Sequence, residues 1–319
     1  MIGLVLAGGF AKRMSPLAYS KPLLPIGPSP CIQHVCEKIN EIESITKVYI
    51  TTADFFKEDY ESWLDSINFN SKYELVFEKS KSDKEKPGAL KSICQFVSSK
   101  KINEDILIVA GDNYFDFSLQ PIIKAYEKES LLTVGLYDLE NFELIKKYSS
   151  VVLDSKNKII KFEEKPKNPN STLISMACYI YPKTFLEHLD KATKSGIVDS
   201  PGRIIEYALK EEVKICGVKL DGNWIDIGDL FSYLKANAQE LKGEKYIDTS
   251  SKVENCKIGK NVYIGKGCTI KNCEIDNSVI LQGCTINSSK IVNSIIGTKN
   301  AFRNKDILNS IQDNSYTVH

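Results

Sequence analysis

Short apolar runs rich in valine and isoleucine alternate with amphipathic stretches along the first 140 residues. The apolar runs are IGLVLA at 2–7, KVYITT at 47–52, YELVF at 73–77, DILIVAGD at 105–112 and LLTVGLYD at 131–138. Amphipathic stretches such as CIQHVCEKINEI at 31–42 and GALKSICQFV at 88–97 predict helices between them. This alternation predicts a mostly parallel sheet with helices on both faces. Functional residues are then expected past the carboxyl ends of the strands.

The pattern changes near residue 150, where strands follow one another with less helix between them. The runs SSVVLD at 149–154, KIIKFEE at 158–164 and TLISMACYIY at 172–181 predict an antiparallel addition to the same domain. Helical stretches follow near 183–194 and 202–212, and GVKLDGNWIDIG at 217–228 predicts a last strand and turn. LFSYLKANAQEL at 230–241 predicts a closing helix, so we expect a first domain over 1–245.

Residues 256–296 repeat a triplet made of a small residue, any residue and an aliphatic residue, at steps of five or six. Side-chain alternation places the first and third members on one strand face, which predicts a left-handed parallel β-helix over 246–300. Residues 301–319 are expected to form a C-terminal tail. We expect removal of 250–319 to spare the chemistry and to change assembly or solubility. Cys256, Cys268, Cys273 and Cys284 take the small inward position, which favours core packing over metal or redox chemistry.

Composition narrows the classes of partner and compartment. The chain has 319 residues with 42 basic and 41 acidic side chains, so no global field points to nucleic acid. No apolar run is long enough to span a membrane, and no leader segment is seen, so we expect a cytoplasmic protein without a membrane partner. Nine cysteines without a CxxC pair fit a reducing compartment.

The loop after the first strand, LAGGFAKRMSPLAYSKPLLPIG, carries the first candidate chemistry. Gly8 and Gly9 allow backbone amides to approach a phosphate closely, and Arg13 and Lys21 add two cations. The sequence is neither a Walker A motif nor GxGxxG. A polyphosphate site and a tight turn with solvated charges explain these residues equally well.

Two aspartates are candidate metal ligands. Asp112 ends the apolar run DILIVAGD, and Asp226 lies in the turn GNWIDIGD. A polyphosphate site needs hard oxygen ligands for Mg²⁺, which both could supply. The alternatives are a turn cap for Asp112 and a helix-capping turn in which Asp229 is the cap.

The segment FEEKP at 162–166 places an acidic pair beside a lysine. In a strictly extended strand Glu164 and Lys165 point to opposite faces, so one could bind sugar hydroxyls and the other a phosphate. Pro166 is expected to bend the chain nearby. Exposed charge is the competing interpretation.

Five motifs, LAGGFAKRM, SKPLLPIG, VAGDN, FEEKP and WIDIGD, occur in the order and spacing of sugar-1-phosphate nucleotidyltransferases. Over residues 1–240 the chain resembles this family. The resemblance implies a Rossmann-like, GT-A-like α/β fold with a mixed sheet, and some members carry a C-terminal left-handed β-helix. It also implies Mg²⁺-dependent joining of an NTP and a sugar-1-phosphate into an NDP-sugar and pyrophosphate.

The resemblance implies roles for the matching residues. The nucleotide is bound by Leu6, Ala7, Gly8, Gly9, Gly88 and Asp112, with Gly88 against the base. Arg13 and Lys21 contact the leaving pyrophosphate and the α-phosphate, and Asp112 and Asp226 hold Mg²⁺. Glu164 binds sugar hydroxyls and Lys165 the phosphate of the sugar substrate, near Ser149, where many relatives have glycine.

The resemblance favours glucose-1-phosphate with dTTP or UTP, ahead of mannose-1-phosphate with GTP. The segment EKSKSDKEKPGALKS at 78–92 lacks the family's PLGTA form, so base choice does not transfer. A non-catalytic nucleotide-sugar-binding regulatory protein and an acyltransferase are the rival classes. An acyltransferase usually needs a histidine in the β-helix, but His34, His188 and His319 lie outside the repeat. The β-helix offers a surface for a homo-oligomer.

Overall fold

The computed structural model describes residues 1–9, 12–17, 19–67, 69, 72–79, 88–197 and 202–313. Its contacts divide the chain into two compact units. The first unit comprises Met1–Gly8, Val35–Gly111 and Asp116–Trp224, and the second comprises Gly9–His34, Asp112–Phe115 and Ile225–His319. The predicted site residues are therefore distributed over both units.

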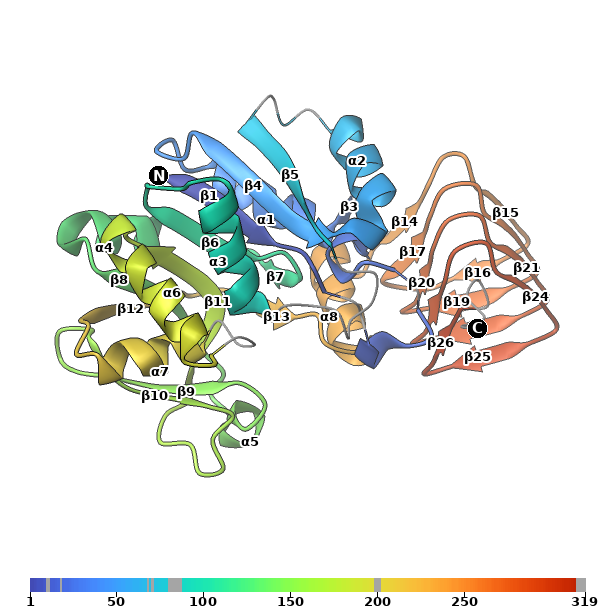
Figure 1. Cartoon of the computed structure of the whole chain (residues 1–319). Coiled ribbons are helices and arrows are strands. Elements are labelled where there is room, and N and C mark those ends of the chain that lie inside the picture. The colour runs from blue at the N-terminus through green and yellow to red at the C-terminus, as the bar shows by residue number, and fades with distance from the viewer. Residues whose placement is uncertain are drawn as a thin grey trace. The chain divides into compact units, whose positions relative to one another are not determined.

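A seven-stranded sheet forms the centre of the first unit (Figure 1), in the order β12-β8-β11-β6-β1-β4-β5. Its strands are β1 (Ile2–Leu6), β4 (Lys47–Ala53), β5 (Tyr73–Glu78), β6 (Ile106–Ala110), β8 (Leu132–Asp138), β11 (Leu173–Tyr181) and β12 (Ile215–Lys219). Strand β1 pairs in parallel with both β4 and β6, whereas β11 runs antiparallel to β6 and β8. The predicted mixed α/β sheet is confirmed.

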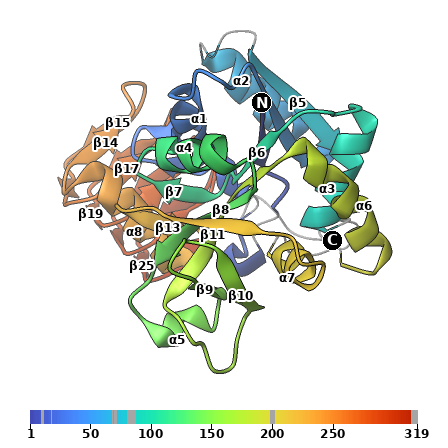
Figure 2. The ribbon, with the colours of Figure 1, turned by 90° about the vertical axis from the view of Figure 1, so that its left-hand side faces the viewer.

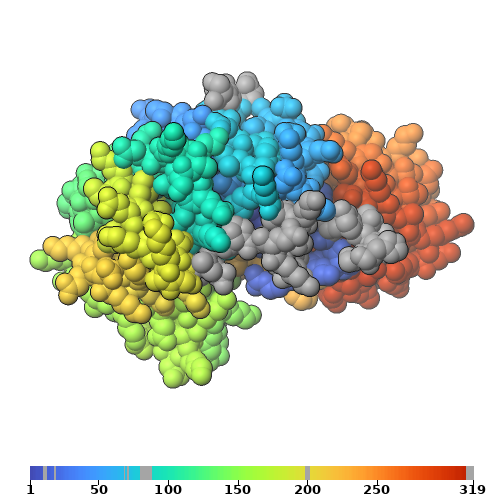
Figure 3. All heavy atoms as spheres, in the orientation of Figure 1, coloured from blue at the N-terminus to red at the C-terminus, as the bar shows by residue number. Residues whose placement is uncertain are grey.

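Helices cover this sheet, as the alternation predicts. They are α1 (Cys31–Asn40), α2 (Lys57–Ser66), α3 (Ala89–Ser99), α4 (Gln120–Glu129), α6 (Leu186–Lys194) and α7 (Arg203–Lys210), with the 3₁₀ turns η3 (Asp54–Phe56) and η6 (Lys183–Phe185). The short helix α5 (Phe142–Ile145) lies away from this sheet in Figure 1 and Figure 2. Figure 2 shows α4 on one side of the sheet and α3 with α6 on the other. The side chains of α3 and α6 lie side by side on one face in Figure 3. Within the described ranges, each helix is too short or too polar to cross a lipid bilayer.

The segment GVKLDGNWIDIG differs from the expectation of one strand and a turn. It forms two strands, because Gly222 takes a φ of +135° and separates β12 from β13 (Trp224–Asp226). Strand β13 pairs with β7 (Asn113–Phe115) in a sheet of its own. The antiparallel hairpin of β9 (Ser149–Leu153) and β10 (Ile159–Glu164) agrees with the predicted addition.

The second unit contains the segment after Gly9 and the closing helix. Its elements before the β-helix are η1 (Lys12–Met14), η2 (Lys21–Leu23), β2 (Pro25–Ile26), β3 (Ser29–Pro30) and α8 (Leu230–Leu241). Asn237 on α8 accepts a 2.9 Å hydrogen bond from the Gly27 amide and donates one of 3.2 Å to the Asn261 carbonyl. Asp229 caps α8 in a capping box with Ser232, which confirms the capping interpretation of Asp229.

The C-terminal region is a parallel β-helix of three sheets (Figure 1), with the orders β14-β17-β20-β23-β26, β15-β18-β21-β24 and β16-β19-β22-β25. The strands are β14 (Lys245–Ile247), β15 (Lys252–Glu254), β16 (Lys257–Ile258), β17 (Val262–Ile264), β18 (Thr269–Lys271), β19 (Glu274–Asp276), β20 (Val279–Ile280), β21 (Thr285–Asn287), β22 (Lys290–Val292), β23 (Ile295–Ile296), β24 (Ala301–Arg303), β25 (Asp306–Leu308) and β26 (Ile311–Gln312). Cys268, Cys273 and Cys284 are buried at the inward positions, so their predicted packing role is confirmed.

The structure corrects the expected tail at 301–319. Strands β24, β25 and β26 pair in register with the coil before them, so the β-helix continues to Gln312. The triplet pattern hides this coil because Asn300 and Lys305 replace the small residue and Gln312 replaces the aliphatic one. Residues 314–319 lie outside the described residues.

Candidate active site

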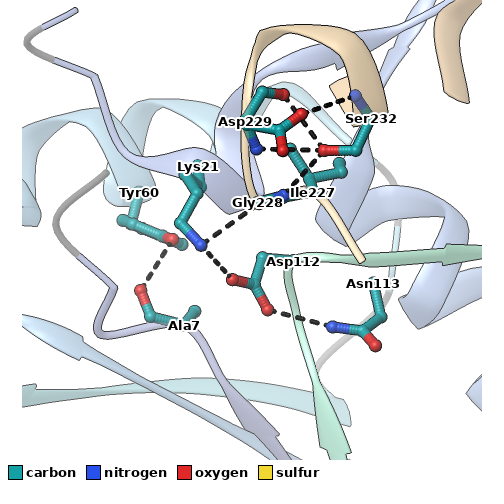
Figure 4. Close-up of polar contacts among 9 residues, drawn as sticks. All are labelled: Ala7, Lys21, Tyr60, Asp112, Asn113, Ile227, Gly228, Asp229 and Ser232. Carbon is teal, nitrogen blue, oxygen red and sulfur yellow. Dashed lines mark hydrogen bonds and ion pairs between the residues drawn. The ribbon is translucent and has the colours of Figure 1, made fainter. Parts of the chain in front are cut away.

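After β1, hydrogen bonds to both the amide and the carbonyl hold the backbone of Ala7. The Ala7 amide donates a 2.8 Å hydrogen bond to the Thr51 carbonyl. The Ala7 carbonyl accepts hydrogen bonds from the Thr52 hydroxyl at 3.3 Å and from the Tyr60 hydroxyl at 3.2 Å, the latter drawn in Figure 4. Because Tyr60 and Thr52 are fully buried, the course of the chain from Leu6 to Gly8 is fixed.

Gly8 and Gly88, both in the first unit, differ in what glycine provides: a side chain at 8 would meet only ordinary van der Waals contact, whereas the backbone at 88 takes a glycine conformation. A Cβ on Gly8 would lie 3.7 Å from Oε2 of Glu78, which is the last residue of β5. Gly88 precedes α3 with φ +90°, a conformation that side chains rarely adopt. Part of the segment 78–92, at 80–87, lies outside the described residues.

In the second unit Lys21 holds Asp112 directly. Its Nζ donates a 2.7 Å hydrogen bond to Asp112 Oδ2 and a 3.2 Å bond to the Ile227 carbonyl (Figure 4). The Ile227 amide in turn donates to the Asp112 carbonyl at 3.1 Å. The pairing of β7 with β13 therefore brings Asp112 and the segment around Asp226 together.

The pKa shifts of Asp226 and Lys21 reflect burial and the charges around them. Burial and the neighbouring Asp112 carboxylate raise the pKa of Asp226 from 3.8 to about 6. Burial alone would lower the pKa of Lys21, but the Asp112 carboxylate outweighs it and the pKa is raised, with Asp226 adding to the effect. Lys21 is therefore a cation fixed by Asp112 and stabilised further by the charge of Asp226.

Arg13 and Gly9 also lie near these charges or the segments that carry them. The Arg13 guanidinium lies 3.1–3.2 Å from the point where a Cβ on Gly228 would stand, so glycine at 228 allows this approach. A Cβ on Gly9 would lie 3.8 Å from Lys21 Cε and 4.0 Å from Asp112 Oδ2. We call Arg13, Lys21, Asp112 and Asp226 the charged group.

The charged group suits a divalent cation that is completed by substrate. Asp112 and Asp226 offer hard oxygen ligands, and the pKa of Asp226, raised by burial and then by Asp112, marks a carboxylate whose charge a cation would stabilise. Among the described residues no cluster of three or more acidic, histidine or cysteine side chains forms a metal site. Two carboxylates are typical of Mg²⁺ sites that also use substrate phosphates.

The sugar-side candidates lie in the first unit, and Lys165 differs from the extended-strand expectation. Strand β10 ends at Glu164, and Lys165 follows with φ +48°, its amide donating a 2.6 Å hydrogen bond to the Tyr148 carbonyl. Side-chain alternation therefore does not apply to this pair. The same backbone conformation occurs at other non-glycine residues, such as Lys101 and Ser130, so at Lys165 it only redirects the side chain relative to the strand.

Glu164 and Ser149 are held by neighbours within the first unit. The Glu164 amide donates a 3.0 Å hydrogen bond to Glu206, and Glu164 Oε2 lies 2.7 Å from the point where a Cβ on Gly202 would stand. Ser149 is 4% exposed, and its hydroxyl accepts a 2.9 Å hydrogen bond from the Ser175 amide. Ser149 therefore shapes β11, and its contact with sugar stays a prediction.

Sequence reasoning missed three residues that shape the site: Tyr60, Glu78 and Gly228. Tyr60 carries no local signal, because its partner Ala7 is distant in sequence. The signal for Glu78 was its place at the carboxyl end of a strand. Gly228 could have been found from its place between Asp226 and Asp229 in the quoted WIDIGD motif.

Two family descriptions match the chain. Residues 2–243 match the family described as Nucleotidyl transferase, and residues 241–312 match the GMPPB C-terminal domain. Together they cover the sheet of the first unit, the charged group and the β-helix.

Curated relatives agree with this assignment. The chain is 28% identical over 277 residues to the "Bifunctional protein GlmU" of Methanocaldococcus jannaschii, covering 84% of this chain and 61% of that protein. It is 31% identical over 283 residues to the GlmU protein of Methanococcus maripaludis, with 85% and 62% covered. The chain thus spans about three fifths of the length of these two relatives. A "Putative mannose-1-phosphate guanyltransferase" of Sulfolobus acidocaldarius is 25% identical over 285 residues, with 84% and 74% covered.

A solved structure supports the fold. A crystal structure of a "Putative Glucose-1-Phosphate Thymidylyltransferase" from Bacillus anthracis superposes with a TM-score of 0.65 at 23% identity, covering 75% of this chain and 94% of that one. With the match over residues 2–243, these findings establish that the chain belongs to the nucleotidyl transferase family.

Proposed function

We propose that the chain joins an NTP and a sugar-1-phosphate into an NDP-sugar and pyrophosphate. The observation that carries this proposal is the charged group, in which Lys21 bonds Asp112 beside Asp226 while Arg13 lies against Gly228. Two cations and two carboxylates held together in this way suit polyphosphate chemistry, which requires charge neutralisation and no covalent nucleophile.

The reaction needs little from the protein beyond position and charge. A phosphate oxygen of the sugar substrate forms a bond to the α-phosphorus of the NTP, and the bond from that phosphorus to the bridging oxygen breaks. Pyrophosphate leaves with the electron pair. Lys21 would contact the α-phosphate and Arg13 the departing pyrophosphate, which offsets repulsion between the two anionic substrates. Leu6, Ala7, Gly8 and Gly9 would supply the loop along the nucleotide.

Asp112 and Asp226 would hold Mg²⁺, which when bound neutralises charge on the phosphates. Until it binds, Lys21 balances Asp112 through their ion pair. The carboxylates act only as ligands in this proposal.

Glu164, Lys165 and Ser149 are proposed for the sugar side. The left-handed backbone at Lys165 is held by the hydrogen bond from its amide to the Tyr148 carbonyl. The position from which its side chain extends is therefore fixed. Glu164 would accept hydrogen bonds from sugar hydroxyls, because an ionised carboxylate only accepts. Lys165 would bind the phosphate of the sugar.

The base is the finer question, and one contact favours guanine over the pyrimidine of the first expectation. Oε2 of Glu78 lies close to Gly8, on the loop proposed for the nucleotide. A carboxylate accepts two hydrogen bonds, which suits the adjacent N1–H and N2–H₂ donors of guanine. Uracil and thymine offer one N–H between two carbonyls that would repel a carboxylate. The mannose-1-phosphate guanyltransferase relative agrees with this preference.

A substrate matrix tests the proposal. Pyrophosphate release is measured with GTP, UTP, dTTP, ATP and CTP against glucose-1-phosphate, mannose-1-phosphate and N-acetylglucosamine-1-phosphate, with Mg²⁺ and with EDTA. We expect Mg²⁺-dependent release that requires both substrates, with the highest kcat/KM for GTP. The Glu78→Gln variant should lower the preference for GTP over UTP by roughly 10-fold or more, since a bidentate pair contributes about 1–3 kcal/mol of discrimination.

Two outcomes would count against parts of this proposal. A folded protein that binds nucleotide-sugar without turnover on any pair would favour the regulatory alternative. Release with UTP or dTTP at higher kcat/KM than with GTP would retain nucleotidyl transfer and exclude the guanine preference. The acyltransferase alternative gains no support from His34 and His188, which pack on Tyr114 and Phe185 outside the β-helix strands.

A further inference from the structure

One sheet of the β-helix presents apolar side chains outward. In β20 and β23, Val279 and Ile295 point away from the coil, whereas their neighbours Ile280 and Ile296 belong to its interior cluster. Val279 and Ile295 are nonetheless 0% exposed. We call this surface, with Tyr263 and Ile311, the apolar face.

The apolar face shares one buried cluster with the segments that carry the charged group. The other members of this cluster, all in the second unit, include Met14 and Leu17 from the loop after Gly9, Tyr114 from β7, and Ile225 and Ile227 from the segment around β13. Met14 and Ile227 are 0% exposed. The other named members are at most 7% exposed, so the cluster is largely shielded from water.

The sequence interleaves this cluster with the charged group. Arg13 precedes Met14, and Asp226 stands between Ile225 and Ile227. Asp112 lies two residues before Tyr114 on the strand that pairs with β13. A packed interior restricts its side chains to a few arrangements, so each buried neighbour fixes the backbone that carries a charge.

We propose that the apolar face of the β-helix is the support that positions Arg13, Asp112 and Asp226, and that Ile295 is a positioning residue of the reaction. The inference rests on the proposed function of the charged group. It reverses the expectation that removal of 250–319 would spare the chemistry, because that segment contributes Val279, Leu281 and Ile295 to the cluster under the site.

A matched pair of variants separates position from stability. Ile295→Ala opens a cavity in the cluster that includes Met14 and Ile227, and Ile291→Ala opens one of the same side-chain size in the interior of the coil. Both isoleucines are 0% exposed. Each variant is assayed at a temperature where circular dichroism shows that both are fully folded.

For Ile295→Ala we expect kcat to fall roughly 10- to 100-fold, since a shift of about 1 Å at a reacting group can cost 10²-fold. The KM for sugar-1-phosphate should change less than twofold, because Glu164 and Lys165 belong to the first unit. Ile291→Ala should retain kcat within twofold, and Ile295→Val should recover most of the loss. Equal losses in Ile295→Ala and Ile291→Ala, or wild-type kcat in a folded Ile295→Ala, would overturn the inference.

A binding experiment keeps this inference separate from the proposed function. Calorimetry with Mg²⁺ and inorganic tripolyphosphate probes the charged group without turnover. We expect binding about 10-fold weaker in Ile295→Ala than in Ile291→Ala, from the same displacement of the charged group. If the wild type lacks turnover but shows this difference, the proposed function fails and the positioning role stands. Equal binding in the two variants overturns the positioning role.

Discussion

Two outward surfaces of one β-helix differ although the interior behind them is the same. Behind the apolar face the interior is filled by Ile264, Ile280 and Ile296, and behind the opposite sheet by Ile275, Ile291 and Ile307. That second sheet, β16-β19-β22-β25, turns Lys257, Glu274, Lys290 and Asp306 outward, and we call it the charged face. Lys257 and Lys290 each lie 3.6 Å from Glu274.

The comparison shows that inward and outward residues of the repeat have different roles. Inward residues stack the coils, and through residue 296 they follow the same small-x-aliphatic pattern on each sheet. Outward residues decide whether a sheet meets water or packs against other parts of the chain. The apolar face has lost its polar outward residues in β20 and β23, and the segments that carry the charged group pack there.

The largest expected effect is a loss of activity when a charge is removed and the apolar packing stays intact. Asp112→Asn should lower kcat/KM by roughly 10²–10³-fold, because it removes one of two carboxylates proposed for Mg²⁺ and the partner of Lys21. The melting temperature should stay within a few degrees of wild type, since the apolar cluster is unchanged. Steady-state kinetics and thermal melts check this together. Near-normal activity would remove Asp112 from the site.

Placing a charged residue, as found on the charged face, in the apolar face should give the next largest effect. Val279→Lys places an unpaired charge in a fully buried cluster and should lower stability by about 3–5 kcal/mol. Chemical denaturation measures the loss. The matched control is Lys290→Ala on the charged face, which should stay within about 0.5 kcal/mol of wild type. A stable, active Val279→Lys would show that the apolar face packs against nothing essential.

The carboxylate pair gives an effect that depends on pH. The pKa of Asp226 is raised from 3.8 to about 6, so ionised Asp226 disfavours the native state, and the stability that its protonated form contributes is lost as pH rises through 6. Asp226→Asn should therefore be more stable than wild type at pH 8, by up to about 3 kcal/mol. The advantage should vanish below pH 4 and shrink when Mg²⁺ is added.

Thermal melts of Asp226→Asn and wild type from pH 4 to pH 8 test this. A variant less stable than wild type at pH 8, or a difference that does not depend on pH, would show that burial and Asp112 do not disfavour ionised Asp226 in the native state.

The smallest effect is expected on the charged face. Glu274→Ala removes the partner of both Lys257 and Lys290, yet exposed ion pairs contribute only about 0–1 kcal/mol. Stability and kcat should both stay close to wild type, and the small loss should disappear at high salt. A large loss of activity would mean that the charged face also supports the site.

Much of the fold was predictable because its signals are local. Valine- and isoleucine-rich runs with helices between them predicted the sheet, and the small-x-aliphatic triplets predicted the β-helix. The last coil was missed because Asn300, Lys305 and Gln312 break the triplet, although its strands pair in register.

The residues of the candidate site could be predicted from the sequence, but the packing that positions them could not. Motif order brought Arg13, Lys21, Asp112 and Asp226 into one proposal, and the structure holds all four in one unit. The short pairing of β7 with β13 and the left-handed backbone at Lys165 depend on distant partners, which sequence spacing does not reveal. The sequence also did not reveal that Val279 and Ile295 are buried, because the residues that cover them are distant along the chain.

The most direct test of the central claim follows the phosphorus atoms. The protein is incubated with Mg²⁺, a hexose-1-phosphate and GTP labelled either at the α- or at the γ-phosphate, and the products are separated. The account predicts that the α label enters the NDP-sugar and the γ label enters pyrophosphate, in equal amounts. Release of the γ label as orthophosphate, or an α label that never reaches a sugar, would contradict it.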